Sequence, residues 1–254
     1  MIAILSPAKS LDFETNAKYN FHSEAVFADE TAYLAKKLSN MSKKKIADLM
    51  HVSENLADLN YNRYKNWNFD TNEGKKQAIY AFTGDVYRGL DVDQFDKADI
   101  EYAQNHLRIL SGIYGLLKPM DLMQPYRLEM GTKWQITKKN KNLYAFWGDK
   151  ITEQLNQSLH GYTPKVLVNL ASNEYYKAVN VKKFDGKIID IMFQENKNGE
   201  YKTIPIYSKL ARGMFAKFMI LQRVNSTQDL QLFNDGGYAF HKSLSTANKL
   251  VFTR

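Results

Sequence analysis

The densest group of polar side chains that could carry out chemistry lies within residues 111–134. There, Tyr126, Arg127, Glu129 and Lys133 stand close together among apolar residues. An arginine binds a carboxylate or phosphate through paired hydrogen bonds, and a neighbouring glutamate can orient the ligand or accept a proton. Arg127 and Glu129 are therefore candidate catalytic residues, and Tyr126 and Lys133 are candidate pocket residues. The alternative is a buried Arg127–Glu129 ion pair that only braces a long loop.

Other polar side chains follow apolar runs that are typical of strands. Lys9 comes soon after the first run, and Asn169 and Glu174 flank the point where a later run gives way to a predicted helix. Ligands tend to bind at the carboxyl ends of the strands in an open sheet. We therefore add Glu174 to the catalytic candidates and Lys9, Asn169 and Arg212, the last from a basic helix, to the pocket candidates. Each of the two cations could instead be an ordinary surface residue.

A different kind of site is predicted over residues 43–67. The spacing of the apolar residues indicates two short helices joined by a turn at residues 51–53. A run of three lysines, at positions 43–45, occupies the first turn of the first helix. A positive charge there opposes the helix dipole by about 0.3–1 kcal/mol. This cost is easier to explain if the lysines meet an anion.

Such a helix pair can hold DNA phosphates through backbone N–H groups at its turn and through side-chain cations. Tyr61, Tyr64 or Trp67 could stack on an unpaired base. No base-reading element is evident, so binding would depend on whether the DNA is duplex or locally opened, and not on its sequence. The candidate DNA-binding residues are Lys43, Lys44, Lys45, Val52, Ser53, Arg63 and Lys65. The alternative is a structural helix pair whose charges are solvated.

Several other chemistries have no basis in the sequence. The chain has no Cys, which excludes thiol peroxidase chemistry, disulfides and thiolate metal sites. The five His show no close ligand spacing, and no P-loop or dinucleotide-binding glycine motif is present. We therefore expect no metal and no cofactor. The first residues lack the pattern of a signal peptide or membrane span, which favours a cytoplasmic protein without a membrane partner.

The elements that must position these residues alternate along the chain. Apolar runs predict strands of one sheet at residues 2–5, 78–82, 107–110, 165–170, 187–193 and 249–252, and helical patterns lie near 29–40, 43–51, 54–67, 147–159, 172–179 and 208–224. An Asn198-Gly199 turn predicts a two-stranded hairpin over residues 193–207. The interleaving favours an α+β (mixed α/β) fold with a central mixed sheet. No linker is evident, which favours a single compact domain over residues 1–254.

The composition indicates an anionic partner. Lys and Arg number 35 against 27 Asp and Glu, which leaves a formal net charge of +8 in 254 residues. Such an excess raises the local concentration of polyanions around a protein. It suits nucleic acid or a small phosphorylated ligand and does not distinguish between them.

Five segments together resemble one known family. They are "LSPAKSLDF", "FTGDVYRGL", "LSGIYGLLKPMDLMQPYRLEMGTKW", "LVNLASNEYYKAV" and "LARGMFAKF". In the same order and over nearly the whole chain, they resemble the YaaA family of peroxide stress proteins. Ser10 in the first segment departs from the threonine expected there.

The resemblance implies a cytoplasmic bacterial protein that helps cells to survive hydrogen peroxide by limiting free intracellular iron. It also implies a mixed α/β fold with a basic cleft and a helix-hairpin-helix element that binds duplex or locally opened DNA. At the matching positions, it assigns the hairpin to residues 49–59, within an element at about 43–67, and Lys9, Arg127 and Lys133 to the cleft. His51 and Ser53 stand where the helix-hairpin-helix motif has glycines.

Two functions of different classes follow from the residues and the resemblance together, and the roles in peroxide stress and iron limitation are implied by the resemblance alone. The first is a DNA-binding protein of the peroxide stress response that also limits free iron. The second is an enzyme that acts on a nucleotide or a nucleic-acid base in a polar pocket at the strand ends. A purely structural or partner-binding protein would explain the aromatic content but not the net charge.

Overall fold

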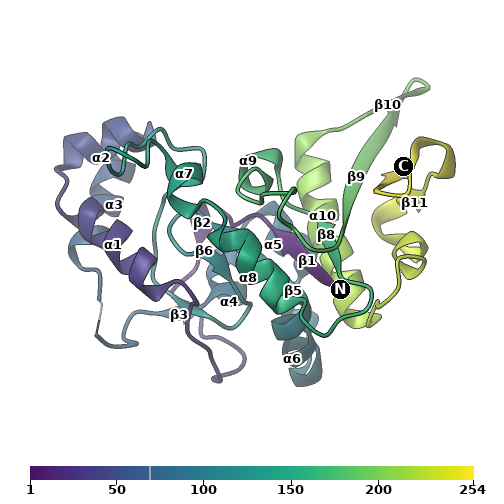
Figure 1. The fold of residues 1–254 in the computed structure, drawn as a ribbon, viewed down its shortest axis with the longest axis horizontal. Coiled ribbons are helices and arrows are strands. Elements are labelled where there is room, and N and C mark those ends of the chain that lie inside the picture. Colours follow the sequence, from purple (N-terminus) through teal and green to yellow (C-terminus); the bar gives the residue numbers. More distant parts are fainter. Residues whose placement is uncertain (69) are drawn as a thin grey trace.

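A central sheet of eight strands runs through the computed structural model, which describes residues 1–68 and 70–254 (Figure 1). Its strands are β1 (Ile2–Leu5), β5 (Leu107–Ser111), β6 (Gly115–Leu117), β8 (Val166–Asn169), β9 (Lys187–Lys197), β10 (Glu200–Lys202), β11 (Ala239–Phe240) and β12 (Lys249–Thr253). They are ordered β11-β12-β9-β8-β1-β5-β6, and β10 pairs with the end of β9. The pairs from β12 to β5 are parallel, and the outer pairs are antiparallel. The mixed α/β fold with a central mixed sheet is thus confirmed.

Two further pairs of short strands lie outside this sheet. They are β2 (Ser10–Leu11) with β4 (Phe82–Thr83), and β3 (Lys76–Gln77) with β7 (Leu122–Met123), both antiparallel. The first pair places the chain that follows β1 beside the residues that follow β4. These two segments form one wall of the candidate site described below.

The strands at the centre of the sheet are covered on both faces. All residues of β1 and β8 are buried, and this explains why both sequences are continuous apolar runs without alternation. The strand β9 extends beyond the cover, and its burial weakens toward the hairpin with β10. The carboxyl ends of β1 and β8 are therefore fixed by packing on both faces of the sheet.

The described residues form ten α-helices and four short 3-10 helices. The α-helices are α1 (Ala28–Ser39), α2 (Lys43–Met50), α3 (Glu54–Lys65), α4 (Ala78–Ala81), α5 (Asp85–Leu90), α6 (Lys97–His106), α7 (Leu143–Trp147), α8 (Lys150–Ser158), α9 (Asn173–Tyr176) and α10 (Pro205–Leu221). Helices α1, α2 and α3 form a group at one end of the molecule, and β10 and β11 lie at the other (Figure 1). One continuous apolar core joins the two ends, from Tyr64 in α3 to Phe252 in β12. The chain is a single compact domain. None of the described helices is both long and apolar enough to cross a membrane.

Helices α5 and α10 pack with their backbones in contact. A Cβ atom at Gly213 would lie 1.8 Å from the carbonyl oxygen of Val86, and one at Gly89 would lie 2.1 Å from that of Leu210. No residue larger than glycine fits at either position without moving a helix. This contact fixes α10 beside the start of α5 and, through its packing on β1, beside the central sheet.

Three sequence-based predictions differ from the structure. Residues 78–82 form the helix α4 and only the first residue of β4, because an apolar run buried on every side does not reveal its period. Residues 147–159 form the end of α7 and the separate helix α8, divided at Gly148 with its positive φ of 50°. The Asn198-Gly199 hairpin is confirmed, but its second strand ends at Lys202, and Pro205 begins α10.

Candidate functional site

A pocket of about 280 Å³ opens where β1 and β8 end. These strands are parallel neighbours, with Ile4 opposite Asn169, so their carboxyl ends meet at one edge. From β1 the chain continues to β5 on one side, and from β8 it continues to β9 on the other. The pocket therefore lies where the direction of the connections reverses, which is the usual place for a ligand in an open α/β sheet.

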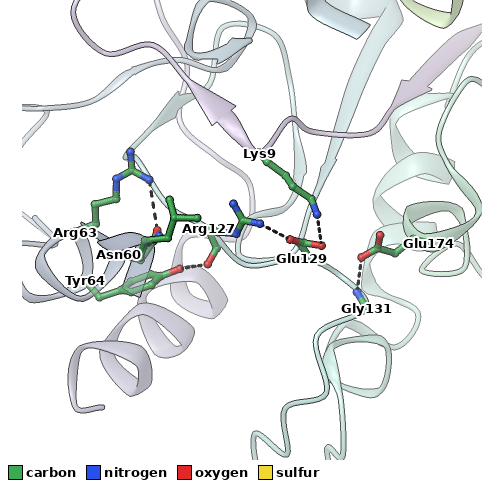
Figure 2. Close-up of polar contacts among 9 residues, drawn as sticks. Lys9, Asn60, Arg63, Tyr64, Arg127, Glu129, Gly131 and Glu174 are labelled. Atoms are coloured by element: carbon green, nitrogen blue, oxygen red, sulfur yellow. Dashed lines mark hydrogen bonds and ion pairs between the residues drawn. The ribbon is translucent and has the colours of Figure 1, made fainter. Parts of the chain in front are cut away.

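Four residues predicted from the sequence line this pocket, namely Lys9, Glu129, Glu174 and Arg212. Glu129 interacts with two cations: its Oε2 lies 3.0 Å from Lys9 Nζ, and its Oε1 lies 3.2 Å from Arg127 Nη2. Figure 2 shows Glu129 between them. The Arg127–Glu129 pair of the bracing alternative is thus present, and the same carboxylate also faces the pocket.

Glu174 links the start of α9 to the loop that carries Glu129. Its Oε1 accepts a hydrogen bond of 2.9 Å from the Gly131 N–H (Figure 2), and its carbonyl oxygen accepts one of 2.8 Å from the Tyr144 hydroxyl. A Cβ atom at Gly131 would come within 3.0 Å of the same Oε1. The glycine therefore allows this close approach, and the Glu174 carboxylate is held at the pocket.

The wall formed by α10 carries Lys209 and Arg212, which are three residues apart and so lie on one face of the helix. Neither makes an ion pair with any described residue. The Nε atom of Arg212 is buried without a hydrogen-bond partner in the described part of the chain. Burial lowers the pKa of the Arg212 guanidinium, because its charge is partly removed from water.

The remaining pocket candidates do not line this pocket. Tyr126 is buried, its hydroxyl lies 2.6 Å from Ser111 Oγ, and burial raises its pKa well above the usual value. Asn169 is buried and donates a hydrogen bond of 2.8 Å to Asp190 Oδ1. Lys133 is exposed on the surface. Tyr126 and Asn169 are therefore parts of the scaffold around the site.

Sequence reasoning missed several residues of the pocket. Ser6, Asp85 and Tyr175 line it, as does Lys209, which the sequence shows only as part of a basic helix. The Ser172 N–H donates a hydrogen bond of 2.8 Å to Ser6 Oγ, which joins the ends of β8 and β1. The available signal was position alone, since Ser6 directly follows the first predicted strand.

The two helices predicted over residues 43–67 are present as α2 and α3, which contact each other. The side chain of Ser42 caps α2 by accepting a hydrogen bond of 3.3 Å from the Lys45 N–H. In the turn, His51 adopts a left-handed conformation with φ 50°, a backbone shape that favours glycine, and the exposed Ser53 precedes α3. The backbone is thus left-handed at His51, the first of the two positions where the motif has glycines, whereas Ser53, the second, has an ordinary extended backbone with φ −62°.

The charges of this helix pair differ in their surroundings. Lys43 Nζ lies 2.9 Å from Asp58 Oδ1, whereas Lys44 and Lys45 are exposed and make no ion pair with a described residue. Arg63 is half-buried, and burial, with the nearby positive charge of Arg127, lowers the pKa of its guanidinium. The remaining two candidates are Val52, half-buried in the turn, and the exposed Lys65.

The prediction that Tyr64 or Trp67 stacks on a base is wrong. Both are buried, with 1% and 8% of their surface exposed, and their rings stack on each other with centroids 5.9 Å apart. The Tyr64 hydroxyl donates a hydrogen bond of 2.8 Å to the Arg127 carbonyl oxygen (Figure 2). Only Tyr61 is partly accessible, and the Nζ atoms of Lys43 and Lys65 lie 5.7 and 5.5 Å from its ring centroid.

In the part of the chain that the structure describes, no group of three or more His, Asp or Glu side chains is placed to hold a metal ion. The acidic residues of the pocket are instead matched with cations or N–H groups. The arrangement can bind an anionic group and orient hydroxyl or amino donors against carboxylates.

Comparison with known proteins covers almost all of the chain. The sequence model of the family described as peroxide stress protein YaaA matches residues 1–244. A protein of Tolumonas auensis, named UPF0246 protein, is 49% identical over 255 residues, which span 100% of this chain and 98% of that protein.

Proposed function

Because the chain belongs to the family of the peroxide stress protein YaaA, we propose that it protects cells from hydrogen peroxide by binding DNA in the cytoplasm. Family membership supports the general role in oxidative stress. The helix pair α2–α3 supplies the proposed DNA-binding surface, and the partner is duplex or locally opened DNA.

One observation carries this proposal: Lys44 and Lys45 lie exposed in the first turn of α2 and have no acidic partner among the described residues. A positive charge at that place opposes the helix dipole. A DNA phosphate would offset the cost and would release counterions on binding. Lys43 contributes less, since Asp58 already neutralises it.

The preference for opened DNA would depend on a single aromatic side chain of the helix pair. With Tyr64 and Trp67 buried, Tyr61 is the one aromatic side chain of these three that can reach an unpaired base. We propose that Tyr61 adds a modest preference for bubbled over duplex DNA, without sequence specificity. Tyr61→Ala should remove this preference and leave duplex binding almost unchanged.

The test is fluorescence anisotropy of labelled duplex and bubbled DNA over a series of salt concentrations. Lys44→Ala/Lys45→Ala should flatten the plot of log affinity against log salt by about 0.9 for each phosphate that the variant no longer neutralises. The control, Lys197→Ala/Lys242→Ala, removes the same charge from two exposed lysines in the C-terminal part of the chain. Equal reductions of affinity in both variants would mean that only net charge matters, and no binding by the wild type would refute the proposal.

We propose, as part of the same protective role, that the protein limits free intracellular iron. A strain that lacks the protein should contain more iron detectable by electron paramagnetic resonance during peroxide stress. Complementation with Lys44→Ala/Lys45→Ala then tells whether the effect on iron depends on DNA binding. Unchanged iron in the deletion strain would contradict this part of the proposal.

A second candidate function is an enzyme that acts on a nucleotide or a nucleic-acid base. It is favoured by the convergence of Lys9, Glu129 and Glu174 on one pocket at the strand ends. Glu129→Gln should then abolish peroxide protection while DNA affinity stays unchanged. Normal protection by this variant, with its fold verified by circular dichroism, would exclude a catalytic role for Glu129.

A further inference from the structure

We propose that the pocket at the ends of β1 and β8 binds the phosphate group of a small, hydroxyl-bearing metabolite through Lys209 and Arg212. The inference rests on the pocket of the second candidate function. It requires neither catalysis there nor DNA binding at α2–α3.

In the pocket, the carboxylates have partners within the protein, but the two cations of α10 have none among the residues that the structure describes. Glu129 interacts with two cations, Asp85 Oδ1 lies 2.6 Å from Arg88 Nη2, and Glu174 accepts the Gly131 N–H. Each carboxylate that lines the pocket therefore has a partner within the protein. The two cations of α10 have none among the described residues, so the charge left for a ligand to neutralise is positive.

The guanidinium of Arg212 carries part of this excess positive charge and is partly buried in the pocket wall. Its guanidinium makes no hydrogen bond to a described residue, and its Nε is buried. A buried cation without a partner is costly, and an anion that pairs with the exposed end of the same guanidinium would offset that cost. The planar fork of arginine suits a phosphate, and Lys209, on the same face of α10, would add a second charge.

The position of Arg212 is built into the packing of α10. The residue that follows it is Gly213, whose backbone touches that of Val86 in α5. This contact allows little movement of the helix, so the backbone of Arg212 is fixed relative to α5, whose first residues line the same pocket. A cation on a fixed backbone loses less conformational entropy on binding than one on a mobile segment, which favours a specific ligand.

The volume of the pocket and the carboxylates across from α10 indicate which other chemical groups the ligand has. The pocket is about 280 Å³, just below the usual range of about 300–1,000 Å³ for ligand pockets, so it has room for no more than one small metabolite. Glu129 and Glu174 can accept hydrogen bonds from hydroxyl groups, and they would repel the further phosphates of a polynucleotide. A sugar phosphate or a mononucleotide has both the single phosphate group and the hydroxyl groups that these side chains would bind.

The test is isothermal titration of the full chain with ribose 5-phosphate, inorganic phosphate and ribose. Wild type should bind ribose 5-phosphate more tightly than inorganic phosphate, and ribose should not bind. Arg212→Gln and Lys209→Gln should each weaken ribose 5-phosphate binding by about tenfold or more. The matched control is Lys217→Gln on the same helix, whose lysine pairs with Asp91 at 2.7 Å and does not line this pocket.

Arg212→Lys keeps the charge without the fork and should bind with an intermediate affinity, which guards against a misfolded glutamine variant. The proposal is overturned if wild type binds neither phosphate compound at millimolar concentration, or if Arg212→Gln binds as wild type does. DNA anisotropy on the same variants separates the two proposals, because Arg212→Gln should bind DNA normally. If it instead fails to bind DNA and no phosphate compound binds wild type, the two cations belong to the DNA-binding surface.

Discussion

At the scale of single residues, the two cations on Glu129 differ in how far they are removed from water. The side chain of Arg127 is 18% exposed and that of Lys9 is 62% exposed, although both reach the same carboxylate. A pair that is largely buried becomes costly when one partner is removed, whereas an exposed pair contributes little. Arg127 therefore depends on Glu129 for stability, and Lys9 is more free to serve a ligand.

This difference predicts unequal effects of two substitutions. Glu129→Gln should lower the free energy of unfolding by about 1–3 kcal/mol, because it leaves the buried end of Arg127 without a counter-charge. Lys9→Met should lower it by less than about 1 kcal/mol. Urea unfolding followed by circular dichroism measures both. Equal effects would indicate that the ion pair with Arg127 does not brace the loop.

His106 predicts how stability depends on pH. Burial lowers the pKa of its imidazole, and its Nδ1 lies 2.9 Å from the Met1 carbonyl oxygen. The unfolded chain therefore binds a proton at a higher pH than the folded chain, so stability falls as the pH drops through the ordinary value of about 6.5. His106→Gln should flatten the fall in unfolding free energy between about pH 7.5 and 5.5.

The matched control for this measurement is His22→Gln, which changes an exposed imidazole. It should leave the pH dependence as in the wild type. A steeper fall of stability on acidification in His106→Gln than in wild type would contradict the assignment.

At the scale of elements, the sequence predicts best those segments whose burial follows a simple pattern. The strand β1 begins and ends where predicted, and α2 and α3 agree within two residues, because apolar period and capping residues are local properties. The run at residues 78–82 is buried on every side, so its period carries no information and the structure shows a helix there. The pocket is harder to predict, since Lys209 and Arg212 reach it only through packing of α10 on distant segments.

Gly213 tests this long-range packing. Gly213→Ala should destabilise the chain by about 3 kcal/mol, the upper end of the usual cost of overpacking, because the new Cβ would meet the backbone of α5. Leu221→Ala, on the same helix but 37% exposed, should cost about 1 kcal/mol or less. Thermal and urea unfolding provide the measurement, and a mild effect of Gly213→Ala would mean that α5 and α10 can separate while the fold persists.

At the scale of the whole molecule, the two proposed sites belong to one folded unit. The loop with Arg127 and Glu129 contacts α3 through the Tyr64 hydroxyl and contacts α9 through Glu174 (Figure 2). The apolar core is likewise continuous between the α1–α3 end and the C-terminal strands. A substitution that destabilises one end of the molecule should therefore also lower the stability of the other end.

This continuity predicts a single cooperative unfolding transition. The three tryptophans, Trp67, Trp134 and Trp147, are buried and lie in the first 150 residues, whereas α10, the longest helix, lies in the C-terminal part. Tryptophan fluorescence reports on the surroundings of these three side chains, whereas far-ultraviolet circular dichroism averages over all helices, α10 included. Their urea midpoints should coincide, as two-state unfolding requires. An earlier fluorescence transition would show that the α1–α3 end unfolds by itself, and the helix pair could then open without disturbing the pocket.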